Sequence, residues 1–159
     1  MLNIQCPTFV AGFLLLCVAG AAGCTRSTDA CNAADAKPDL SGCKRTGIAS
    51  FYAEKFTGRE MADGTRMDPN ADNAASKTLP LGTTAKVTNL ETGLSAEVTI
   101  QDRGPYVKGR IIDLSPATAR EIGLDRKAGI TTVAVEPIEV PLPDGSVQQG
   151  ATAGDETRP

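Results

Sequence analysis

Residues 94–106 read LSAEVTIQDRGPY, and this stretch decides the fold because apolar and polar side chains alternate along it. The apolar face holds Leu94, Ala96, Val98 and Ile100, and the polar face holds Ser95, Glu97, Thr99 and Gln101. A period of two predicts a half-buried β-strand. The strand ends at Asp102, just before a Gly-Pro turn, and a strand end can direct its last side chain into a cleft.

Short strand patterns continue on both sides of this stretch. We predict further strands at residues 47–53, 83–90, 110–114 and 130–136. The loop from Glu91 to Gly93 predicts a hairpin between two of them. Strands this short and numerous do not fit alternating strand–helix units, so we expect a mainly β protein built as a small closed barrel.

One or two short helices accompany the predicted strands. Ser115 is suited to be an N-cap, Pro116 fits the first helical position, and Gly123 ends the pattern after Ile122. A second short turn is predicted over residues 72–77.

Composition and charge narrow the chemistry that the chain can perform. Its 159 residues include 16 Lys and Arg, 19 Asp and Glu, and no histidine, for a net charge of −3. Ser-His-Asp and Cys-His catalysis and HExxH zinc sites are therefore excluded. A general acid or base must be a carboxylate, a lysine, a tyrosine or a perturbed cysteine. The acidic balance also argues against nucleic acid as a partner.

The N-terminus has the pattern of an export signal. Residues 1–23 carry no charged side chain, and residues 9–22 are all apolar or small. The run ends in Ala-Ala-Gly before Cys24, which predicts acylation of Cys24 and a membrane contact through the lipid. We expect a lipoprotein on the periplasmic face of a bacterial membrane, the outer membrane being preferred. Plain cleavage near Ala22, giving a soluble periplasmic protein, is the alternative.

Composition also divides the rest of the chain. Residues 24–46 are polar and Ala-rich and are predicted to be a flexible tether, residues 47–136 are the folded unit, and residues 137–159 are a disordered tail. Cys31 and Cys43 remain after the signal and Cys24 are set aside. An oxidising periplasm favours a disulfide between them, with two free thiols as the alternative.

Four segments carry a family resemblance over nearly the whole folded unit. They are residues 47–52 (GIASFY), 56–59 (FTGR) with 62–64 (ADG), 77–83 (KTLPLGT) with 87–90 (VTNL), and 102–106 (DRGPY) with 109–115 (GRIIDLS). In this order and spacing they resemble the rare lipoprotein A (RlpA-like) family of double-psi β-barrels. The resemblance implies a six-stranded double-psi barrel and, for active members, lytic transglycosylase cleavage of peptidoglycan strands that lack stem peptides. Peptidoglycan is then the partner, and cell-division or wall-synthesis proteins are further partners that the sequence does not identify.

The sequence departs from the family at two of the three positions of the family's catalytic set. Family members carry His where this chain has Ser76, and Glu where it has Thr65. The third member, the Asp of Asp-Arg-Gly-Pro, is retained as Asp102. The resemblance therefore leaves Asp102 as the candidate general acid and base. A catalytically impaired peptidoglycan-binding or structural barrel is the alternative function.

A single carboxylate can serve a lytic transglycosylase. The muramyl C6 hydroxyl is an internal nucleophile, so no water needs activation, and one group can first donate and then accept a proton. Ordinary glycoside hydrolysis, by contrast, uses two carboxylates. The alternative role for Asp102 is structural, as a cap of the following turn or a partner of Arg103 or Arg110.

Other side chains in the same segments are candidates for substrate contact. The aromatic rings of Tyr52 and Tyr106 can stack on sugars, Arg103 can contact N-acetyl carbonyls, and Thr65 and Ser76 can hydrogen-bond a sugar. Core packing for Tyr52 and a structural ion pair for Arg103 are the alternatives. The sequence contains no phosphate-binding loop and no metal-ligand cluster, so it implies no cofactor and no metal.

Overall fold

The computed structural model describes residues 38–150. Within this range the elements are β1 (Arg45–Phe51), η2 (Glu54–Phe56), β2 (Asn73–Ser76), β3 (Thr84–Asn89), β4 (Ser95–Asp102), β5 (Arg110–Leu114), α1 (Pro116–Glu121), β6 (Ile130–Pro141) and β7 (Val147–Gln149). Neither helix of this part of the chain is long and apolar enough to span a bilayer.

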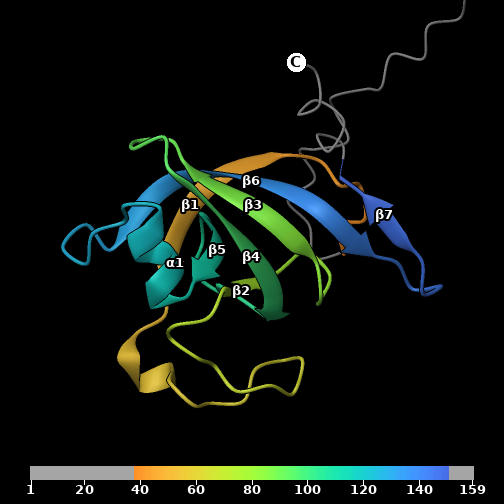
Figure 1. The fold of residues 1–159 in the computed structure, drawn as a ribbon, viewed down its shortest axis with the longest axis horizontal. Helices are drawn as coiled ribbons and strands as arrows, with labels where there is room; N and C mark the ends of the chain where they lie inside the picture. Colours follow the sequence, from red (N-terminus) through yellow and green to blue (C-terminus); the bar gives the residue numbers. More distant parts are fainter. Residues whose placement is uncertain (1–37, 151–159) are drawn as a thin grey trace, which may run out of the picture.

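Six of these strands close into a barrel (Figure 1). Neighbouring strands follow the order β1-β5-β2-β4-β3-β6, and β6 pairs back onto β1 to complete the ring. The pairs β1–β5 and β2–β4 are parallel, and the other four pairs of the ring are antiparallel. This confirms the prediction of a mainly β, six-stranded double-psi barrel with short helices.

The barrel interior is filled by small and branched apolar side chains. One continuous buried cluster draws residues from all six strands of the ring and from the segment around α1. On β4, Ala96, Val98 and Ile100 are buried, as the alternation predicts. Leu94 was expected on the same face but is 51% exposed, because it belongs to the hairpin turn before the strand begins.

The predicted helix is confirmed as α1, at one end of the barrel (Figure 1). The Ser115 hydroxyl oxygen accepts a hydrogen bond from the Thr118 backbone N–H at 3.1 Å, as an N-cap should. Ala119 and Ile122 are buried in the core cluster. Gly123 follows with a φ of +72°, a conformation that favours glycine and ends the helix.

The prediction of a turn over residues 72–77 is wrong, because β2 occupies this position. The strand pairs with β4 on one side and β5 on the other, and all four of its residues are buried. A strand that is buried on both faces carries no apolar–polar alternation. Its sequence therefore lacks the signal that revealed β4.

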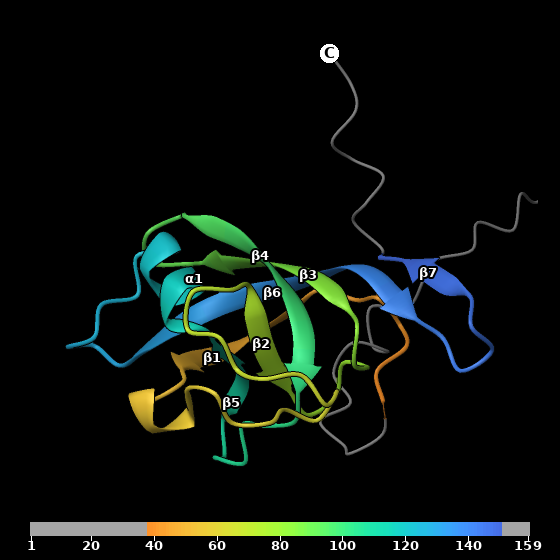
Figure 2. The ribbon, with the colours of Figure 1, turned by 60° about the horizontal axis from the view of Figure 1, so that its bottom comes forward.

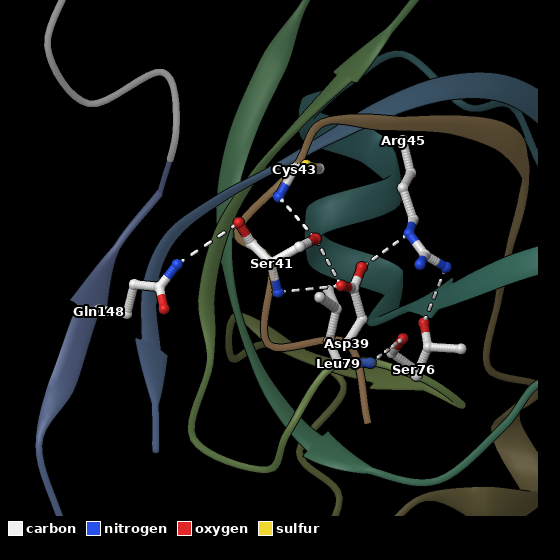
Figure 3. A network of polar contacts seen from close by, with 8 residues as sticks. Asp39, Ser41, Cys43, Arg45, Ser76, Leu79 and Gln148 are labelled. Carbon is white, nitrogen blue, oxygen red and sulfur yellow. Dashed lines mark hydrogen bonds and ion pairs between the residues drawn. The ribbon is translucent and has the colours of Figure 1, made fainter. Parts of the chain in front are cut away.

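The predicted tether boundary at residue 46 is also wrong, since β1 begins at Arg45 and residues 38–44 pack beside it. Asp39 is buried, forms an ion pair with Arg45 at 2.7 Å, and donates its backbone N–H to the Thr78 carbonyl at 2.6 Å (Figure 3). Polar pairing holds this segment. Apolar composition, on which the prediction relied, does not detect such pairing.

The prediction of a disordered tail from residue 137 is wrong up to residue 150. β6 continues to Pro141, and β7 folds back on it as a hairpin at one side of the barrel (Figures 1 and 2). The Gln148 side chain donates a hydrogen bond to the Ser41 carbonyl at 3.4 Å, which links this hairpin to the segment before β1 (Figure 3).

The cysteine and signal predictions fall largely outside the described residues. Cys43 is disulfide-bonded. Its predicted partner Cys31, the predicted lipidation site Cys24 and the predicted signal over residues 1–23 lie outside residues 38–150.

Candidate active site

Asp102 is the last residue of β4, and three donors hold its carboxylate. The Tyr52 hydroxyl donates to Oδ2 at 3.0 Å. The backbone N–H groups of Ala62 and Arg103 donate to Oδ1 at 3.1 and 2.8 Å. These donors come from three separate parts of the chain, so the carboxylate is fixed in both position and orientation.

The long segment between η2 and β2 forms one wall of a cleft beside Asp102. It lies along one side of the barrel, next to the end of β4 (Figures 1 and 2), and the Asp63 N–H anchors it by donating to the Gln101 carbonyl at 3.0 Å. The Asp102 cleft has a volume of about 350 Å³. It is lined by Tyr52, Phe56, Arg59, Glu60, Met61, Met67 and Asp102.

Tyr52 connects the cleft to the barrel. The side chain is 9% exposed, its ring packs edge-on against Phe56 with centroids 5.9 Å apart, and its backbone N–H donates to the Leu114 carbonyl at 2.9 Å. Burial and the adjacent Asp102 charge raise the pKa of the Tyr52 phenol far above its usual range. Tyr52 is thus a neutral hydrogen-bond donor to Asp102, and it is not the exposed ring that a stacking platform requires.

This raised pKa predicts a loss of stability in alkali. The phenol stays protonated in the folded state, whereas in the unfolded state it ionises near pH 10, so stability is complete below pH 10 and falls as pH rises further. From pH 9 to pH 11 the wild-type free energy of unfolding should fall by about 1.4 kcal/mol more than that of Tyr52→Phe. Urea denaturation at each pH measures the difference.

Tyr106→Phe is the matched control for this prediction, because Tyr106 is 81% exposed and has the same phenol. It should retain the wild-type dependence on pH. Equal slopes for the wild type and Tyr52→Phe would show that the Tyr52 phenol does not titrate differently in the two states.

A second carboxylate, Glu60, lines the same cleft and was not predicted from the sequence. It lies on the segment between η2 and β2, just after Arg59, and it is not one of the residues that carry the family resemblance. Two further carboxylates near Thr65, Asp63 and Asp68, form hydrogen bonds within their own loops. Asp63 accepts from the backbone and hydroxyl of Thr65, and Asp68 accepts from the Asn70 N–H.

The two positions that depart from the family motif do not bring a titratable group to Asp102. Thr65 is exposed and donates its hydroxyl to Asp63 at 2.6 Å, and it does not line the cleft. Ser76 is 2% exposed, accepts a hydrogen bond from the Leu79 N–H at 3.3 Å, and lines a separate groove.

The remaining predicted contact residues also lie outside the cleft. The Arg103 guanidinium donates to the Ser76 and Leu79 carbonyls at 3.2 and 2.6 Å, so it fixes the backbone after β2. Tyr106 follows the cis Gly104–Pro105 peptide bond and its ring is exposed, so a stacking role for Tyr106 stays a prediction.

Asp113 forms an ion pair with Arg110 and accepts a hydrogen bond from the Ser50 hydroxyl. Its charge adds to the rise in the Tyr52 pKa. Asp113 therefore has a structural role, because it joins β5 to β1 through Ser50.

The chemistry that this arrangement can perform is proton transfer. A carboxylate with fixed orientation stands at the wall of a cleft, beside a phenol that cannot itself become the base near neutral pH. Among residues 38–150, no group of three or more His, Cys, Asp or Glu side chains is placed to hold a metal ion.

The described residues form a double-psi β-barrel with a carboxylate at the wall of a cleft. Sequence comparison identifies the family to which the protein belongs. Residues 44–135 match the model of the family described as lytic transglycolase. This match covers more than half of the chain, and the protein belongs to that family.

Two relatives and one solved structure illustrate the similarity. The chain is 53% identical over 102 residues to endolytic peptidoglycan transglycosylase RlpA of Pasteurella multocida (strain Pm70), covering 64% of this chain and 34% of the relative. It is 50% identical over 93 residues to a probable RlpA transglycosylase of Synechocystis sp. (strain ATCC 27184 / PCC 6803 / Kazusa), covering 58% and 29%. The Streptomyces papain inhibitor aligns with a TM-score of 0.47 and 24% identity, covering 61% and 96%. The chain thus spans about a third of the curated relatives' length.

Proposed function

We propose that this barrel is a peptidoglycan lytic transglycosylase that cleaves glycan strands free of stem peptides. The observation that carries the proposal is the Asp102 carboxylate, which three hydrogen bonds hold at the wall of the cleft. Family membership and relatives named as endolytic peptidoglycan transglycosylases support the choice of reaction.

In the proposed reaction Asp102 acts first as general acid and then as general base. Its protonated form gives a proton to the glycosidic oxygen as the bond from that oxygen to muramyl C1 breaks. The C6 hydroxyl oxygen of the same muramyl residue then bonds to C1, and its proton passes to the Asp102 carboxylate. The product carries a 1,6-anhydromuramyl end, no water is consumed, and Asp102 returns to its starting state.

The neighbours of Asp102 support this role by positioning. Tyr52 and the Ala62 and Arg103 N–H groups hold the carboxylate, so little reorganisation is needed when the proton moves. Arg59 and Glu60 supply polar contacts at the cleft wall, while Met61 and Met67 line it as buried apolar side chains.

A second candidate is a barrel that binds peptidoglycan without cleaving it. The observation in its favour is that Thr65 and Ser76, which do not titrate near neutral pH, stand at the positions of the family Glu and His, and that their hydroxyls form hydrogen bonds with residues close in sequence. A positioned acid or base contributes about 10²–10⁴-fold to a rate, and its loss can leave only binding.

The proposal also includes the location of the protein. The apolar run over residues 9–22 and the small residues before Cys24 support export, with the barrel held at the periplasmic face of a membrane through a lipid on Cys24. Release as a soluble periplasmic protein is the alternative. Replacing Cys24 by Ala and following incorporation of a labelled fatty acid distinguishes the two.

Digestion of purified stem-free glycan strands tests the proposed reaction. Mass spectrometry of the products should reveal new anhydromuramyl ends that increase with time and with protein concentration. Hydrolytic reducing ends without anhydro products would overturn the transglycosylase assignment. Retained binding to sacculi without any new ends, even at high protein concentration, would favour the second candidate.

A further inference from the structure

A second, larger hollow of about 800 Å³ lies between the start of β1, the turn after β2, and the start of β5. We call it the basic groove because five cationic side chains line it. These are Lys44, Arg45, Lys77, Lys108 and Arg110. Among residues 38–150, no Asp or Glu lines this groove, although the whole chain has a net charge of −3. Cationic side chains are therefore concentrated in this groove, although the chain as a whole is acidic.

The five cations differ in how their charge is compensated. Lys44, Arg45 and Arg110 form ion pairs with Glu136, Asp39 and Asp113, and none of these carboxylates lines the groove. Lys77 and Lys108 are exposed, and within residues 38–150 neither forms an ion pair. The groove thus contains two ammonium groups without an ion-pair partner among the described residues and three cations that are paired.

Two sets of contacts connect the basic groove to the Asp102 cleft. Arg103, next in sequence to Asp102, donates to the carbonyls of Ser76 and Leu79, and both of these residues line the groove. Arg110 lines the groove and pairs with Asp113, whose charge acts on Tyr52 in the cleft wall. The basic groove therefore lies beside the end of β4 that carries Asp102.

The ligand that fits these observations is a polymer of sugars with carboxylates attached directly to its backbone. When a stem peptide is removed from a muramyl residue, the amide that joined it becomes a free lactyl carboxylate. A stripped strand thus carries one carboxylate in each disaccharide, whereas in an intact strand that group is a neutral amide.

Resting on the proposed function, we propose that the basic groove binds the free lactyl carboxylates of stripped strands through Lys77 and Lys108. The groove thereby selects stripped strands over strands that retain their peptides. Exposed lysine–carboxylate pairs are weak and screened by salt, so the contribution should be moderate and should diminish at high ionic strength.

Binding of fluorescently labelled stripped strands, measured by anisotropy, tests this proposal. The proteins carry Asp102→Asn so that strands stay uncut. The double variant Lys77→Gln/Lys108→Gln should bind about tenfold more weakly than its parent, and each single variant about threefold more weakly. Strands whose lactyl carboxylates are converted to methylamides should bind the parent and the double variant equally.

The matched control is Arg120→Gln/Lys127→Gln, which removes two exposed charges that line neither hollow. It should bind stripped strands like the parent. Equal weakening by this control, or equal weakening of binding to methylamide strands, would overturn the proposal. Tighter binding of the parent to anionic phospholipid vesicles or to single-stranded DNA than to stripped strands would also overturn it.

This test separates the proposal from the proposed function. Because it measures binding by a variant that does not turn over, its result does not depend on whether anhydromuramyl ends are formed. If the wild-type protein forms such ends but binds strands with free carboxylates and methylamide strands equally, the proposed role of the groove is refuted and the proposed reaction stands. Discrimination without any product would refute the reaction alone.

Discussion

Asp102→Asn is expected to lower the rate of anhydromuramyl end formation by about 10²–10⁴-fold. An amide can neither give a proton to the departing glycosidic oxygen nor take one from the C6 hydroxyl. Its carbonyl oxygen can still accept hydrogen bonds from the Tyr52 hydroxyl or the backbone N–H groups, so the cleft should keep its shape. Single-turnover digestion of stripped strands, with quantification of anhydromuramyl ends by mass spectrometry, gives the rate.

Glu60→Gln is the matched control for this prediction, because it removes one carboxylate charge from the same cleft. Glu60 is exposed and forms none of the hydrogen bonds that hold Asp102, so its loss should cost less than about tenfold, well below the effect of a proton-transfer group. Equal losses in the two variants would mean that Asp102 contributes only its negative charge to the cleft and does not transfer a proton. An active Asp102→Asn variant would place the acid elsewhere.

Leu114→Ala is expected to lower the free energy of unfolding by about 2–5 kcal/mol. Leu114 is fully buried in β5, where it pairs with Phe51 of β1 and Ala74 of β2. Truncation leaves a cavity where a parallel and an antiparallel pair meet, and closed strand pairing on both sides limits how far the barrel can collapse into it. Thermal unfolding followed by circular dichroism should show a fall in Tm of at least about 8 °C.

Leu90→Ala provides the comparison, since Leu90 is 52% exposed at the end of β3. It should change stability by no more than about 0.5 kcal/mol. A loss below 1 kcal/mol in Leu114→Ala would show that the barrel can repack around the missing side chain.

The parts of the fold that were predictable are those with one buried face. β4 alternates because one face meets the core and the other meets solvent, and α1 is marked by the residues that cap it at both ends. β2 is buried on both faces and carries no such pattern. Residues 38–44 and β7 are held by polar contacts between distant segments, which composition does not reveal.

Asp102 was predictable because a motif and a strand end coincide at one residue. Ser76 lies outside the cleft because of the way side chains alternate along β2, and the spacing of the motifs does not predict this alternation. Successive side chains of a strand point to opposite sides, so Ala75 packs with Tyr52 while Ser76 faces the groove. Glu60 reaches the cleft because the segment between η2 and β2 returns to the end of β4. No local sequence pattern predicts this return.

The contact between Gln148 and Ser41 has a consequence for how the protein presents its cleft. It brings the first and last described segments of the barrel together at the side where β7 lies, whereas the segment between η2 and β2 runs along the lower edge of the barrel in Figure 1. Any attachment made through either end therefore pulls on the same side of the molecule.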